Sequence, residues 1–227
     1  MFTLRELLGR HRTVLLLDSA SSRIQTGLLR RERAALWESA ETDAGSGLFA
    51  CVEKLLARAG SPEQPLHFAE IDAILFCDGP GSVLGIRTAA VALRTWKTAY
   101  SQTHYSYCSL AVVGAFLARQ ENLRSFSVIA DARRESWHCL SVDHAGALGP
   151  LRRIPAAELT GALVQPSHFR HWSALPAGVR GVPYDLAVQL PAIDDAALFH
   201  DAPEPDAFLH EEPTYVTWTP QIHRAPA

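Results

Sequence analysis

A glycine-rich stretch at residues 78–82, Asp-Gly-Pro-Gly-Ser, constrains the fold more than any other part of the sequence. It follows an apolar run at 71–77, which is typical of a buried strand. It precedes a run at 86–100 that is rich in Ala, Leu and Val and is typical of a helix. The stretch is therefore predicted to be a strand-to-helix turn, in which Gly79 and Gly81 adopt backbone angles that other residues resist.

Two functions are open to this turn. Pro80 stiffens it, and Ser82 is placed to cap the following helix by accepting from its first free N–H groups. Free N–H groups at a helix N-terminus suit an anion, so phosphate binding is one interpretation. The other is purely structural, a tight turn with a capped helix. The motif alone does not distinguish them.

The composition is that of an ordinary globular protein. The 227 residues suffice for one large domain or two of about 100 residues each. The net charge of −3 gives no overall basic field, and no stripe of aromatic and basic residues suggests stacking of RNA bases. The four cysteines are far apart without a Cys-x-x-Cys pair, which favours free thiols in a reducing cytoplasm. No apolar stretch approaches the roughly 20 residues of a membrane span.

One strand–turn–strand pattern occurs twice. In each copy a strand ends in an aspartate, and a short turn leads into a second strand; the four strands are 13–18, 24–29, 126–131 and 137–142. The repeat predicts two similar α/β lobes facing a cleft, which we assign to residues 1–104 and 105–227. Asp18 and Asp131 at the strand ends are candidates for binding a metal–phosphate complex across that cleft. After Gly149, frequent prolines predict short elements.

The helix after the glycine turn carries a seam of small residues. Gly85, Ala89, Ala92 and Trp96 are four, three and four positions apart, which places them on one helix face. Neighbouring faces are apolar too, so this helix must be covered on more than one side. Either a partner helix of another subunit or the chain's own core could cover the seam.

Catalytic patterns are weak. The ten histidines include one close pair, His168 and His171, with no third ligand nearby, so a metal site is not predicted. Gly81-Ser82 is not a nucleophile elbow, because the Gly-x-Ser-x-Gly pattern is absent.

Four motifs, in the right order, resemble those of the bacterial TsaB (YeaZ) family, inactive paralogues of the tRNA-modifying TsaD/Kae1 proteins. Residues 79–87 resemble its GPGSFTG[LIV]R signature, 15–21 its opening ILALDTAT, 129–133 its AIDAR and 212–216 its late EPxYLR. The resemblance implies a two-lobed actin–hexokinase–Hsp70-like (ribonuclease H-like) fold. It assigns the turn motifs to these residues: Asp18, Gly79, Pro80, Gly81, Ser82, Gly85, Arg87, Asp131 and Arg133.

The resemblance also implies a function. TsaB has no catalytic residues or metal of its own; it pairs with TsaD, which with TsaE and ATP transfers a threonylcarbamoyl group to an adenosine of tRNA. We therefore expect no cofactor in this chain, ATP or ADP at the partner interface, and contact with tRNA only through the complex. The family's dimer surface, used for homodimers or TsaD, maps to the helices at 48–59 and 83–99. The expected contacts are Leu48, Val52, Leu55, Gly85, Ala89, Ala92 and Trp96.

Several positions depart from the family. Val83-Leu84 replaces the usual Phe-Thr, and residues 134–136 replace x-Gly-Glu after Asp-Ala-Arg. In kinases of the same superfamily the first turn usually carries a glycine that lets the backbone close on phosphate, whereas here it is Ser19-Ala20-Ser21. An ATP-dependent small-molecule kinase is the alternative function, and this turn argues against it. The family's old description as a metal-dependent glycoprotease has no support in these residues.

Overall fold

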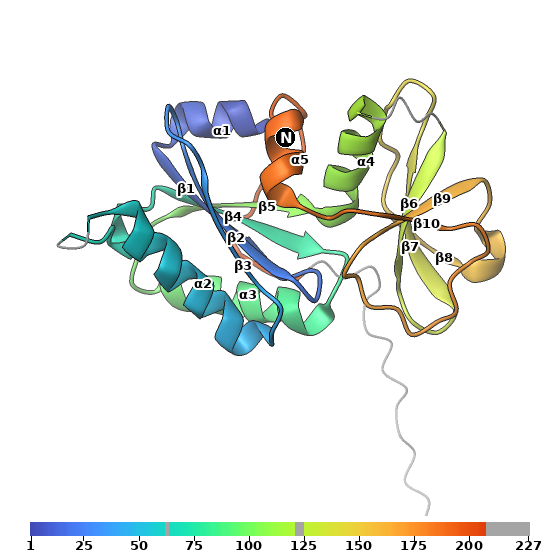
Figure 1. The fold of residues 1–227 in the computed structure, drawn as a ribbon, viewed down its shortest axis with the longest axis horizontal. Coiled ribbons are helices and arrows are strands. Elements are labelled where there is room, and N and C mark those ends of the chain that lie inside the picture. The colour runs from blue at the N-terminus through green and yellow to red at the C-terminus, as the bar shows by residue number, and fades with distance from the viewer. Residues whose placement is uncertain (62–63, 121–124, 208–227) are drawn as a thin grey trace, which may run out of the picture.

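Both sheets of the protein follow the same plan (Figure 1). The computed structural model describes residues 1–61, 64–120 and 125–207. The first sheet has the order β11-β5-β4-β1-β2-β3 and the second the order β10-β9-β6-β7-β8. The first contains β1 (Thr13–Asp18), β2 (Ile24–Arg30), β3 (Leu36–Ala40), β4 (Ala73–Gly79), β5 (Thr103–Cys108) and β11 (Phe199–Asp201). The second contains β6 (Phe126–Asp131), β7 (Ser136–Val142), β8 (Arg152–Pro155), β9 (Ala162–Pro166) and β10 (Arg180–Val182).

The two sheets are topological copies. β1, β2 and β3 form an antiparallel meander, and β4 and β5 then extend the sheet in parallel from β1. β6, β7 and β8 repeat the meander, and β9 and β10 repeat the parallel extension from β6. This duplication confirms the predicted two-lobed α/β fold of the actin–hexokinase type. Asp18 and Asp131 end the two equivalent strands, as predicted.

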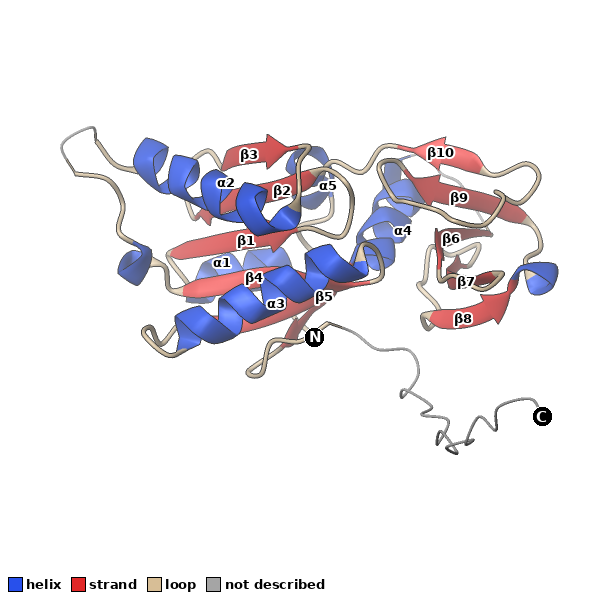
Figure 2. Cartoon of the chain, turned by 90° about the horizontal axis from the view of Figure 1, so that it is seen from below, coloured by secondary structure: helices blue, strands red, loops and turns tan. Residues whose placement is uncertain are grey.

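Helices cover both faces of the first sheet. They are α1 (Leu4–Arg10), α2 (Ala44–Ala59), α3 (Val83–Lys97), α4 (Ser109–Gln120) and α5 (Leu186–Ala192), with short 3-10 turns at Phe68–Glu70 and Ala156–Glu158. α2 and α3 lie side by side on one face, and α1 and α5 lie on the other (Figures 1 and 2). Leu15 and Leu17 of β1 therefore pack in the core beneath α2 and α3, and Val14 and Leu16 in the opposite core.

α4 joins the lobes. Val112 and Leu117 belong to one continuous core with Phe126 and Leu140 of the second sheet and Leu16 of the first. The other face of the second sheet has a much smaller cluster around Ile129, Trp137 and Leu163. The second lobe is thus thinner, and the elements after Gly149 are short, as the prolines predicted.

Most predicted elements are present, with shifted bounds. The helix expected at 48–59 begins at Ala44, because the Asp43 carboxylate caps it by accepting from the Ser46 N–H. β5 was not predicted, since its polar residues, such as His104 and Ser106, alternate with tyrosines in a pattern that lacks an apolar run.

The predicted lobe boundary does not coincide with the sheets. The boundary after residue 104 falls inside β5, and β11 from the predicted second lobe pairs with β5 in the first sheet. The motif at 212–216 lies outside the described residues. Within the described ranges, no helix is both long and apolar enough to cross a membrane.

Candidate functional site

The glycine turn packs directly on the turn between β1 and β2. Gly79 and Gly81 have φ angles of 133° and 154°, which confirms that the turn needs glycine. A Cβ on Gly81 would lie 2.2 Å from the Ala20 carbonyl oxygen, and one on Gly85 would lie 2.1 Å from that of Ser19. Only glycine permits this approach.

Hydrogen bonds hold the two turns together. The Ser82 N–H donates to the Ala20 carbonyl oxygen at 2.6 Å, and the Ser19 hydroxyl donates to the Gly85 carbonyl oxygen at 2.9 Å. Ser82 also caps α3 as predicted, since its hydroxyl oxygen accepts from the Gly85 N–H. The Pro80 carbonyl accepts from the Ser109 hydroxyl at 2.6 Å. The start of α3 therefore faces carbonyl oxygens, which repel an anion, and the geometry favours the structural interpretation of the motif.

Asp18 is completely sealed from solvent. Its Oδ2 accepts from the Tyr107 hydroxyl at 2.7 Å and from the Tyr184 hydroxyl at 2.6 Å, and its Oδ1 accepts from the Ala20 N–H at 3.0 Å. Tyr107 belongs to β5, whereas Tyr184 lies on the segment that returns from the second sheet to α5. The chain's own tyrosines thus occupy the place where a phosphate-binding cleft would need an open carboxylate.

The electrostatics of this cluster agree with its burial. Burial raises the pKa of Asp18, although the hydroxyls of Tyr184 and Tyr107 oppose that shift by stabilising the carboxylate. Burial, and then the neighbouring Asp18, raises the pKa of both tyrosines well above the usual value, so they remain hydrogen-bond donors. The oxygens of Asp18 are committed to donors and have none of the solvent access that a metal–phosphate complex needs. The cluster does not fit a nucleotide, which weakens the kinase alternative.

Asp131 is held differently. Its Oδ2 accepts from the N–H groups of Trp172 and Ser173, both at 2.7 Å, and its Oδ1 accepts from the N–H of Arg133. Burial opposes the charged form, but these backbone bonds together outweigh burial and lower the pKa of Asp131. Arg133 turns back from the strand end, and its guanidinium carbon lies 4.4 Å from the centre of the exposed Trp172 ring. Asp131 and Arg133 therefore anchor a loop of their own lobe, and neither shares a hydrogen bond with Asp18 in the part of the chain that is described.

The predicted interface seam faces inward. Gly85, Ala89 and Ala92 of α3 are buried, and so are three residues of α2, namely Leu48, Val52 and Leu55. All but Gly85 belong to the core between these helices and the first sheet, and Gly85 contacts Ser19. The prediction that this set contacts a partner is wrong for these six residues, because the first sheet covers the seam. Trp96 is half-buried and remains at the edge of the helix pair.

A different face of α3 is exposed and apolar. Leu84 and Val91 are 76% and 56% exposed, two turns apart on the helix. With Phe49 of α2 and Trp96 they line a groove of about 370 Å³ between the two helices, and Arg87 lies on its rim. The Phe49 and Trp96 rings meet edge to face, with centroids 5.8 Å apart. Two large apolar residues on the exposed side of α3, Leu84 and Val91, were the sequence signal for this groove. The sequence analysis considered the spacing of the small residues instead and so did not identify it.

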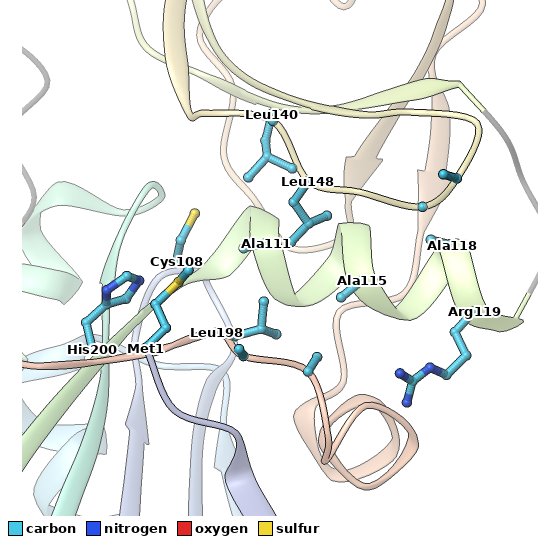
Figure 3. A pocket seen from close by; sticks show the side chains of 15 residues that line it. Met1, Cys108, Ala111, Ala115, Ala118, Arg119, Leu140, Leu148, Leu198 and His200 are labelled. Atoms are coloured by element: carbon cyan, nitrogen blue, oxygen red, sulfur yellow. The ribbon is translucent and has the colours of Figure 1, made fainter.

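A further cavity lies away from the motif residues. About 610 Å³ in volume, it lies between α4, the loop at 145–149 and the segment at 196–200 (Figure 3). Alanines of α4 and the side chains of Leu148 and Leu198 line it, and Arg119 at one end pairs with Asp195. Burial raises the pKa of Cys108, at the other end, to about 12, so that thiol is not a ready nucleophile.

Metal ligands do not converge in the described ranges, where no group of three or more His, Cys, Asp or Glu side chains could hold an ion. Neither His168 nor His171 belongs to such a group, and the His171 ring contacts the Ser173 carbonyl oxygen at 3.1 Å.

Comparison with known proteins adds sequence relatives and solved structures. No family model matches the chain. Two mycobacterial proteins, Rv3421c of Mycobacterium tuberculosis H37Rv and Mb3455c of Mycobacterium bovis, both described as uncharacterized, are 27% identical to it over 140 residues. The match covers 61% of this chain and 63% of each relative, so it spans less than two thirds of their length.

Two solved structures from Pseudomonas aeruginosa share the architecture. YeaZ superposes with a TM-score of 0.54 at 22% identity, over 68% of this chain and 75% of YeaZ. A protein described as similar to the peptidase YeaZ superposes with a TM-score of 0.57 at 19% identity, over 82% of this chain and 97% of that one. This chain has the YeaZ fold. The YeaZ fold here combines a sealed carboxylate in the first lobe with an exposed apolar groove on α2 and α3.

Proposed function

We propose that this chain is a TsaB-type subunit that performs no chemistry itself and pairs with a TsaD-type enzyme in the threonylcarbamoylation of tRNA adenosine. The observation that carries the proposal is the exposed apolar groove between α2 and α3, on a chain with the YeaZ fold. Large exposed apolar side chains cost solubility unless a partner covers them. Leu84, Val91 and Phe49 are the contacts that we assign to the partner.

The closed state of Asp18 supports a non-catalytic role. A carboxylate at the end of the first strand can bind a metal–phosphate complex only when it is accessible, and in this chain two tyrosine hydroxyls occupy that group. We therefore place any ATP or ADP at the interface with TsaD rather than in this chain's cleft, and we expect TsaE to join, and tRNA to be modified, in that complex. A homodimer through the same groove is the expected resting form when TsaD is absent.

Co-purification with the TsaD of the same organism, with and without nucleotide, tests the pairing. Leu84→Asp and Val91→Asp place a charge in the groove on side chains that are already exposed, so the fold should persist while complex formation falls at least tenfold. Val188→Asp is the matched control, because Val188 on α5 is 59% exposed and lies outside the groove.

Each outcome has a definite meaning. A wild-type complex that both groove variants retain would place the partner surface elsewhere. The absence of a wild-type complex under every nucleotide and salt condition would refute the pairing itself. ATP turnover by the isolated chain would refute the non-catalytic role.

A further inference from the structure

An exposed tryptophan in the second lobe is held unusually firmly. Trp172 is 58% exposed, yet its N–H and that of Ser173 both donate to the buried Asp131 carboxylate at 2.7 Å. The same loop is tied to the first lobe, because the His168 carbonyl accepts from the Ser22 N–H at 2.8 Å. The loop is thus fixed at two points, and the indole projects into solvent from a rigid base.

The turn between β6 and β7 of the same lobe places a cation on this ring. Arg133, Arg134 and Glu135 are three consecutive residues with positive φ angles of 64°, 50° and 56°. This unusual backbone, which non-glycine residues adopt at a cost, folds the Arg133 guanidinium over the Trp172 ring at 4.4 Å. The guanidinium lies over one face of the indole, and we call this stacked pair the Trp172 platform.

The exposed charged residues next to the platform in sequence are mostly cationic. Arg134 follows Arg133 directly, and Arg170 lies two positions before Trp172; both are exposed, and neither has an ion pair among the described residues. Glu135 is the one exposed acid of that turn, and the Asp131 carboxylate is directed inward onto three N–H groups. Such a combination suits an anionic ligand that also carries a flat ring.

We propose that the Trp172 platform binds unpaired nucleotides of single-stranded nucleic acid. A base stacks on an exposed face of this indole–guanidinium pair, and Arg134 and Arg170 contact the neighbouring phosphates. Base stacking on aromatic rings and on arginine planes is how proteins bind single strands, whereas a paired helix keeps its bases stacked on one another. The net charge of −3 does not oppose this, because the arginines act locally.

The test measures binding of a fluorescent single-stranded oligonucleotide of about 12 nucleotides to the full chain at low salt, with RNA, DNA and fully paired duplex arms. Trp172→Ala should weaken binding of the single strand by about 5- to 150-fold, which corresponds to the loss of one stacked base. Trp172→Phe should recover part of this loss. Arg170→Gln should reduce the slope of log affinity against log salt by about 0.7.

Controls separate this effect from misfolding and from diffuse charge. Trp172→Ala leaves both N–H groups that hold Asp131, so the melting temperature should be nearly unchanged. Tyr100→Ala and Arg31→Gln remove an exposed ring and an exposed cation of the first lobe and should leave binding intact.

Equal affinity for duplex and single strand, no saturable binding, or full affinity in Trp172→Ala would overturn the proposal. The RNA and DNA arms decide which nucleic acid is preferred. Because TsaD is absent from this assay, a negative result here does not affect the proposed pairing with TsaD. Likewise, a failure of co-purification with TsaD does not affect the proposed nucleic-acid binding.

Discussion

At the scale of residues, Asp18 and Asp131 end equivalent strands but are stabilised by different donors. Tyrosine hydroxyls and full burial surround Asp18 and raise its pKa, whereas three backbone N–H groups lower that of Asp131. A backbone N–H cannot leave its place without unfolding the loop, so Asp131 is a structural anchor. Asp18 instead depends on side chains from distant parts of the chain.

A third acid allows a test by pH. Burial raises the pKa of Asp78 to about 6, above its unfolded value of about 3.8, although a hydrogen bond with Ser106 opposes the shift. The folded state therefore holds this proton more tightly, and the resulting stabilisation is present below about pH 4 and is lost as the pH rises through about 6. Relative to Asp78→Asn, the wild-type free energy of unfolding should fall by up to about 3 kcal/mol between about pH 4 and pH 7. Urea unfolding across this range measures it, with Glu53→Gln as the exposed control; parallel profiles for wild type and Asp78→Asn would contradict it.

At the scale of elements, the start of α3 is determined by contact with the β1–β2 turn. Gly81 and Gly85 bring the helix against the carbonyl oxygens of Ala20 and Ser19, and hydrogen bonds from Ser82 and Ser19 fix that contact. In the motif that looked like an anion site, the N–H groups of Ser82 and Gly85 are thereby bonded within the chain.

Two glycine-to-alanine variants distinguish this close approach from ordinary helix propensity. Gly85→Ala would place a Cβ 2.1 Å from a backbone oxygen, so it should destabilise the fold by about 2 kcal/mol or more. Gly9→Ala in α1 meets nothing within 4 Å and should stabilise by about 0.5–1 kcal/mol. Chemical denaturation of both variants measures the difference. A Gly85→Ala protein as stable as the wild type would mean that α3 does not lie this close to the turn.

At the scale of the whole molecule, the lobes are joined by more than α4. The returning segment donates the Tyr184 hydroxyl to Asp18, and the Gln25 side chain bonds the Tyr184 carbonyl and the Leu186 N–H. These buried hydrogen bonds consequently close the expected cleft between the lobes at the end of β1. Breaking them would leave buried polar groups without a partner, which costs free energy.

Removing one hydroxyl tests this closure. Tyr184→Phe should cost about 1–3 kcal/mol of unfolding free energy, because the buried Asp18 loses a donor. Tyr105→Phe is the control within the first lobe, since its partly buried hydroxyl contacts His11 at 3.0 Å. Hydrogen exchange should rise near residues 18–22 and 183–186 in Tyr184→Phe only. If both variants exchange alike, Tyr184 does not hold the lobes together.

The sequence alone was sufficient for the local structure and the duplicated plan. Strands 13–18 and 126–131 were predicted with their observed bounds, as were the Ser82 cap and the glycine-dependent turn. These features depend on hydrophobic runs, backbone angles and capping, which are interactions between residues close in the chain.

Only the tertiary structure decided which residues are accessible to solvent and which carboxylates are buried. The seam of Ala89 and Ala92 could have faced outward or inward, and the sheet beneath α3 covered it, leaving Leu84 and Val91 exposed. Tyr184 reaches Asp18 across 166 positions and Trp172 meets Arg133 across 39, separations that no local pattern encodes. Burial and hydrogen-bond partners depend on how the lobes pack against each other, so the sequence predicted the motif residues while the fold determined what they contact.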